Sequence, residues 1–209
     1  MSKQSYNKSV FINCPIDRNY RPLFYASVFT IIRCGFYPRC AEEESDSSEI
    51  RLYKIYRMIS ECKYGIHDLS MTCIDKKTRL PRFNMPFELG LFLSAKYFGY
   101  NNQTKKNCLI FEKQTHSYEK YISDIKGQDI SSHDDKSKII ISKIRDWLKT
   151  NSKNKYLPGG SAIWNDYQKF EKWLPQICRT SNLEIAELTY LDYAELIYKW
   201  IETKYPIVN

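Results

Sequence analysis

Short apolar runs alternate with longer stretches of helical periodicity over the first two thirds of the chain. The runs, rich in β-branched and aromatic residues, predict strands at 9–14, 36–41, 63–69, 107–112 and 128–130. Between them, apolar residues recur every three or four positions and predict helices at 20–34, 50–62, 84–98 and 135–149. This alternation is typical of an α/β fold with helices on both faces of a parallel sheet. For five strands we expect the order 2-1-3-4-5.

The alternation stops at a polar segment, 150–160, which contains a proline and two glycines. Two further helices are predicted after it, at 163–170 and 188–205, and the second has a wide apolar face. We therefore expect an α/β domain over 1–150 and a helical C-terminal extension over 151–209. The apolar face should pack on the domain or on a second copy of it.

Composition and charge narrow the range of partners. The net charge is +8, but the lysines are scattered between acidic residues, so nucleic acid is not the expected main partner. The basic field would still favour a polyanionic ligand. Seven cysteines without a C-x-x-C pair, and no signal peptide, favour a reducing cytoplasm. Three histidines without ligand spacing argue against a metal site, and no apolar run approaches the roughly 20 residues of a membrane helix.

Polar side chains follow the first and third predicted strands. In the order 2-1-3-4-5 the strand order reverses between these two strands, and ligands bind outside their carboxyl ends. We therefore expect one crevice there, next to the helix that begins near residue 84. The predicted substrate-binding residues are Asn13, Cys14, Pro15, Asp17, Asp68, Ser70 and Asn84.

Glu88 is the candidate catalytic residue. With Asn84 as the N-cap, the pattern puts Glu88 in the first helical turn, where the free N–H groups favour a carboxylate. Capping alone would explain that position equally well. The apolar neighbours of Glu88 favour a functional role, as does Gly90, which would let a ligand or another segment come close.

Three further residues have competing explanations. His67 and Asp68 lie on opposite faces of their strand, so only one of them faces the crevice. Asp68 is preferred because Ser70 lies on its side, and His67 is interpreted as a core histidine, with a proton donor as the alternative. Arg51 lies one turn from Lys54 and would hold an anion there, or would form ordinary solvated surface.

Four short segments together resemble the TIR domain and, equally, the nucleoside 2-deoxyribosyltransferase-like proteins. They are Phe11-Ile12-Asn13, Ser60-Glu61-Cys62, Asp68-Leu69-Ser70 and Glu88-Leu89-Gly90, within residues 8–145. The chain looks like a bacterial family of this type, of the sort found among anti-phage defence genes. The resemblance implies a flavodoxin-like sheet, Glu88 as the catalytic glutamate, and Asn13 and Asp68 in the nucleoside pocket. The chain departs from both families before Glu88, where Arg82-Phe83-Asn84-Met85-Pro86-Phe87 replaces an Asp-Gly pair or a Trp-Cys pair.

Both families break or remake an N-glycosidic bond to ribose or deoxyribose, so the resemblance implies that chemistry here. One carboxylate suffices when the leaving group is cationic, as nicotinamide is in NAD, whereas a neutral base also needs a proton donor. NAD is therefore the first expected substrate, without a cofactor. The alternatives are a nucleoside deoxyribosyltransferase and a module that binds a nucleotide without cleaving it. We expect a homo-oligomer or a defence-system partner protein.

Overall fold

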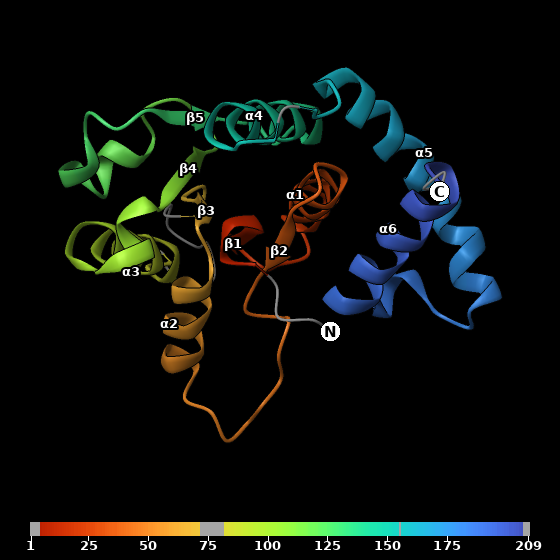
Figure 1. Cartoon of the computed structure of the whole chain (residues 1–209), viewed down its shortest axis with the longest axis horizontal. Helices are drawn as coiled ribbons and strands as arrows, with labels where there is room; N and C mark the ends of the chain where they lie inside the picture. Colours follow the sequence, from red (N-terminus) through yellow and green to blue (C-terminus); the bar gives the residue numbers. More distant parts are fainter. Residues whose placement is uncertain (1–4, 72–81, 155, 207–209) are drawn as a thin grey trace.

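The computed structural model describes residues 5–71, 82–154 and 156–206. Its centre is a sheet of five parallel strands in the order β2-β1-β3-β4-β5 (Figure 1). The strands are β1 (Ser9–Asn13), β2 (Tyr37–Arg39), β3 (Tyr64–Asp68), β4 (Asn107–Glu112) and β5 (Ile130–Ser132). The α-helices are α1 (Arg21–Arg33), α2 (Arg51–Glu61), α3 (Asn84–Phe98), α4 (Ser137–Asn151), α5 (Gly160–Thr180) and α6 (Tyr190–Lys204). The flavodoxin-like order and the parallel pairing confirm the prediction.

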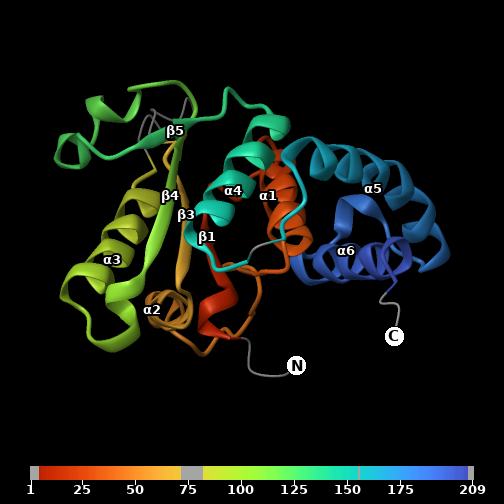
Figure 2. The ribbon, with the colours of Figure 1, turned by 45° about the horizontal axis from the view of Figure 1, so that its top comes forward.

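Helices cover both faces of the sheet, as Figure 2 shows. Helices α1 and α4 pack together on one face, and α2 and α3 pack together on the other. The strands between them are in the core: every residue of β1 and β3 is buried. Strand β2 lies at the edge, which is where a strand tolerates Pro38.

The C-terminal extension packs on the domain of its own chain. Helix α5 contacts α4 and α1, helix α6 contacts α1, and their apolar side chains join one hydrophobic cluster with that face of the sheet. The ring of Phe29 in α1 lies 5.4 Å from that of Phe170 in α5 and 5.8 Å from that of Trp200 in α6. Arg33 adds an ion pair of 2.9 Å to Asp166. The wide apolar face is therefore buried against α1, as expected.

Several predicted boundaries were wrong. The helix expected at 163–170 runs from 160 to 180 and passes through Pro175. Its buried row continues at four-residue spacing through Phe170, Leu174 and Cys178, so packing outweighs the hydrogen bond lost at the proline. The last strand and the last helix of the domain each begin two residues later than predicted. The helix starts later because Asp134 and Asp135 adopt positive φ in the turn before it.

Candidate active site

The end of β1 lies beside the end of β3, with Asn13 opposite His67 in the register. Helix α3 leads away from this edge, and its first turn contacts the end of β1. The side-chain amide of Asn13 donates to the carbonyl oxygen of Met85 over 2.8 Å and lies 3.0 Å from His67 Nδ1. One buried amide therefore joins β1, β3 and α3.

The predicted start of α3 needs correction. The N-cap is Phe83, not Asn84, and among the described residues no side-chain hydrogen bond caps the start of the helix. Glu88 is the fifth residue of the helix, so it lies in the second turn, beyond the free N–H groups that capping chemistry requires. The helix begins before Pro86 because a proline in the first turn removes no hydrogen bond. Capping therefore does not explain Glu88.

Glu88 belongs to the row of α3 that faces the sheet and α2. It lies three residues after Met85 and four before Phe92, and both of these side chains are buried. Glu88 itself is half-buried. Burial raises the pKa of Glu88 to about 7, against the opposing field of the Arg51 guanidinium at the start of α2. The carboxyl group is thus partly desolvated and lies within the field of a cation, as the active-site glutamates of many enzymes do.

His67 is a core residue. Its ring packs edge-on against Phe92, with centroids 4.9 Å apart, and is inaccessible to solvent. Burial lowers the pKa of His67 to about 3, with Lys106 adding to the effect, so the ring is neutral at physiological pH. Nδ1 accepts from Asn13, and the buried Nε2 has no hydrogen-bond partner among the described residues. A neutral, enclosed ring does not serve as a proton donor.

Asp68 points to the other face of the sheet, toward α1 and α4, as the alternation along β3 predicted. It accepts hydrogen bonds from Tyr20 Oη and, over 2.8 Å, from the backbone N–H of Ser70. His133 Nε2 lies 3.1 Å from Asp68 Oδ2 and 2.7 Å from Ser70 Oγ. Burial alone would raise the pKa of Asp68, but the hydrogen bonds from His133, Ser70 and Tyr20 hold it below its ordinary value.

Serine, histidine and aspartate meet in this network, but their geometry excludes a nucleophilic triad. The backbone N–H of Asp135 donates to His133 Nδ1 over 3.0 Å, so in the neutral ring the proton is on Nε2. Ser70 Oγ and Asp68 Oδ2 both contact this same nitrogen, Nε2. In a triad, the acid contacts one ring nitrogen and the nucleophile contacts the other. All four side chains are buried, and the network ties β3 to the segments before α1 and α4.

The remaining predicted residues take different places around the edge. Cys14 is a buried thiol whose pKa is raised well above its ordinary value by burial, then by the charges of Asp68, Cys40, Glu42 and Glu88. Asp17 has a structural role: its carboxylate accepts from the backbone N–H groups of Asn19 and Tyr20, both over 3.0 Å, and pairs with Arg82 over 3.1 Å. The structure therefore divides the predicted set. Asn13, Asn84 and Glu88 lie on the α3 side, and Asp68 and Ser70 lie on the α4 side.

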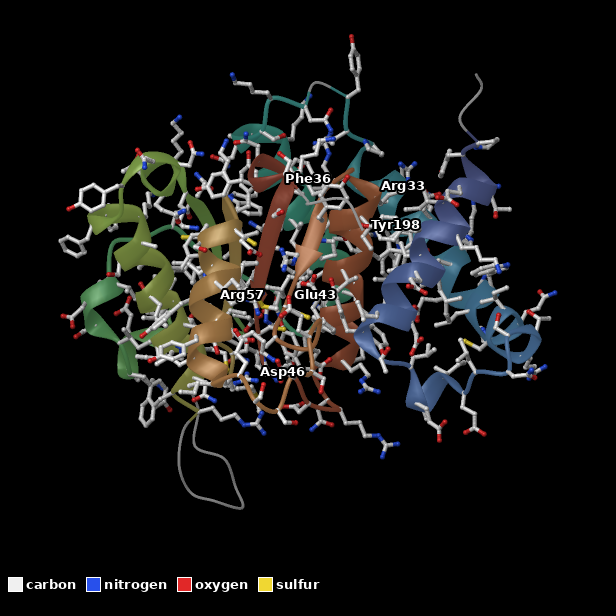
Figure 3. All side chains as sticks on the ribbon, turned by 60° about the horizontal axis from the view of Figure 1, so that its bottom comes forward. Arg33, Phe36, Glu43, Asp46, Arg57 and Tyr198 are labelled. Carbon is white, nitrogen blue, oxygen red and sulfur yellow. The ribbon has the colours of Figure 1, made fainter. Side chains whose placement is uncertain are left out.

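Sequence reasoning missed the charged side chains that hold the β2–α2 connection in place (Figure 3). Arg39 pairs with Glu43 over 2.5 Å and with Glu61 over 3.1 Å, and Arg57 pairs with Glu44 over 2.6 Å and with Glu49 over 3.0 Å. Lys54, proposed with Arg51 as an anion site, donates instead to two backbone carbonyls of this connection. The acidic run after β2 was the available signal, because buried arginines need carboxylate partners.

A cleft of about 630 Å³ opens where the β1–α1 connection meets the α5–α6 connection. We call it the junction cleft. Its lining residues are Pro15, Ile16, Asp17, Arg18, Arg21, Phe24, Tyr25, Glu42, Ile185, Ala186, Leu188 and Tyr190. A second hollow of about 490 Å³ continues toward the β2–α2 connection and shares five lining residues with the cleft: Arg21, Glu42, Ala186, Leu188 and Tyr190. Two predicted site residues, Pro15 and Asp17, thus line a cleft that the extension completes.

Comparison of the chain with known protein families, with curated proteins and with solved structures returns no match. Within residues 5–71, 82–154 and 156–206, no group of three histidine, cysteine or acidic side chains is arranged to hold a metal ion. No helix in the same part of the chain is long and apolar enough to cross a membrane.

Proposed function

We propose that the protein cleaves the N-glycosidic bond of a nucleotide, with Glu88 as the catalytic carboxylate and NAD as the first substrate to test. The observation that carries the proposal is the burial of Glu88 at the reversal point of the sheet, beside the ends of β1 and β3 and opposite Arg51. This is the edge at which ligands of such sheets bind. The resemblance of the Glu88-Leu89-Gly90 segment to TIR and deoxyribosyltransferase-like proteins supports the same chemistry.

The chemistry needs a negative charge against the sugar. The base leaves with the electron pair of the glycosidic bond, which creates an oxocarbenium-like state that a carboxylate stabilises by its field or by a transient ester bond. Water then adds to the anomeric carbon, displacing the carboxylate if the ester has formed, and its proton passes to solvent. A desolvated Glu88 suits this role because its charge acts through a less polar medium than water. Asn13 fixes the first turn of α3 to the end of β1 and so acts as a positioning residue for Glu88. Nicotinamide leaves as a neutral molecule, so no separate acid is required.

The decisive variant is Glu88→Gln, which keeps the shape of the side chain and removes its charge. We expect turnover of NAD to fall by at least about 100-fold, with binding of NAD changed little. Glu195→Gln, at an exposed position of α6, is the matched control and should leave turnover unchanged. If turnover survives Glu88→Gln, the assignment is wrong. If the wild-type protein binds NAD without cleaving it, and Glu88→Gln abolishes that binding, the protein is a binding module instead.

The pH profile gives an independent test. Because burial raises the pKa of Glu88 to about 7, the carboxylate form is lost as the pH falls through that value. A reaction that needs the carboxylate should therefore show kcat/KM rising with pH to a plateau above about 8. A profile that falls with rising pH over the same range would instead assign Glu88 as a general acid.

A further inference from the structure

The junction cleft is built from segments that lie far apart in the sequence. One wall comes from the β1–α1 connection and the first turns of α1, and the other comes from the α5–α6 connection. Its volume of about 630 Å³ is within the range of small-molecule sites. The wall from the α/β domain is formed by the carboxyl edge of the sheet, so the cleft opens at the same edge as Glu88.

Two arginines without carboxylate partners line the cleft, one in the β1–α1 connection and one at the start of α1. Arg18 and Arg21 are exposed, and neither guanidinium forms an ion pair with another described residue. By contrast, Arg33, Arg39 and Arg57 are all paired with acidic side chains. Unpaired guanidinium groups beside a cleft favour an anion with several oxygens, and phosphate matches their fork of donors.

The lining of the cleft also offers a carboxylate and fixed aromatic rings. Glu42 follows β2, the position from which an acidic residue accepts ribose hydroxyls in dinucleotide-binding sheets. Tyr25 stacks on Tyr193 with ring centroids 3.7 Å apart, and Tyr190 Oη donates to the carbonyl oxygen of Pro38. These contacts hold the rings in place before any ligand arrives, which reduces the entropy lost on binding.

We propose that the junction cleft binds a nucleoside phosphate. Arg18 and Arg21 contact the phosphate, Glu42 accepts the ribose hydroxyls, and the base lies against the aromatic wall. This site goes beyond the proposed reaction, because the evidence for it is the cleft and its charged residues. It does not require Glu88 to be catalytic. The ligand is either the distal half of a dinucleotide substrate or a separate nucleotide, since both present the same chemistry.

Binding of ADP to the full chain, measured by titration calorimetry, tests the proposal. We expect the double variant Arg18→Gln/Arg21→Gln to weaken ADP binding by at least about 10-fold, and Glu42→Gln to weaken it as well. Arg179→Gln, an exposed arginine on α5 outside the lining of the cleft, should have no effect. Glu88→Gln should bind ADP like the wild type. Circular dichroism checks that each variant remains folded.

Three results would overturn the site: no ADP binding at about 1 mM, binding unchanged in the double variant, or inorganic phosphate binding as tightly as ADP. Competition in the Glu88→Gln protein then separates the two sources. Displacement of ADP by NAD places the distal half of the substrate in the cleft, and simultaneous binding assigns a separate nucleotide. Either result supports the site. If the Glu88→Gln variant turns over NAD as fast as the wild type, the proposed reaction is refuted. The ADP site is not affected by that result, because it is tested by ADP binding alone.

Discussion

The substitution Tyr20→Phe tests the buried network around Asp68. Tyr20 Oη donates to a carboxylate that is inaccessible to solvent, and phenylalanine removes this donor without changing the packed ring. A hydrogen bond to a charged group contributes about 1.5–3 kcal/mol. Asp68 keeps the N–H of Ser70 and the Nε2–H of His133, so we expect a loss near the middle of this range, about 2 kcal/mol. In a chain of this size that corresponds to a fall in Tm of about 4–8 °C.

Urea unfolding at pH 7 measures the loss directly, and Tyr156→Phe, at a side chain 91% exposed, is the matched control. The effect should depend on pH. The pKa of Asp68 is below its ordinary value, so its stabilisation is present above that ordinary value, about 3.9, and disappears as the pH falls below it. The gap between wild type and Tyr20→Phe should shrink accordingly. A gap under about 0.5 kcal/mol at pH 7 would refute the assignment of Tyr20 as a partner of the charged carboxylate.

Two further predictions concern packing. In Gly65→Ala the new Cβ would lie 2.7 Å from both His67 Nε2 and Phe92 Cε2, so we expect a loss of about 1–3 kcal/mol in urea unfolding. Gly90→Ala adds a Cβ with no described atom within 4 Å and should be neutral or stabilise by up to about 1 kcal/mol; equal stability of the two variants would contradict this packing. A chain ending at residue 155 exposes the face of α1 that carries Phe29, so it should bind a hydrophobic dye and melt at lower temperature. An unchanged melting curve would show that the extension contributes no stability.

The strand order followed from the sequence because each strand is a short apolar run and each helix has a clear period. The register of β1 on β3 then placed Asn13 beside His67, and alternation along β3 correctly sent Asp68 to the opposite face. The sequence pattern predicted helix ends less well where a proline disfavours the helix and the apolar periodicity favours its continuation. Helix α5 passes through Pro175 to Thr180, ten residues beyond its predicted end, because the buried side chains on either side of the proline still pack.

Contacts between distant segments could not be predicted in the same way. His133 follows β5, and it contacts Asp68 at the end of β3 because both strands flank β4 in the sheet. The local sequence around either residue does not predict this contact. The pairing of Arg39 with Glu61 likewise depends on the angle of α2 against the sheet edge. The junction cleft needs both α1 and the extension in place, so the sequence offered only Pro15 and Asp17 as candidates from its rim.

Helix α1 lies between the sheet and the extension, and this position has a consequence for how the protein can change. Its inner side packs on the strands, its outer side packs on α5 and α6, and the residues at its start reach the carboxyl edge. Substitutions in the α5–α6 connection alter one wall of the cleft while leaving Glu88 and its supports untouched. In the terms of the two proposals, ligand preference and bond cleavage can therefore diverge independently, because α1 separates the extension from the sheet.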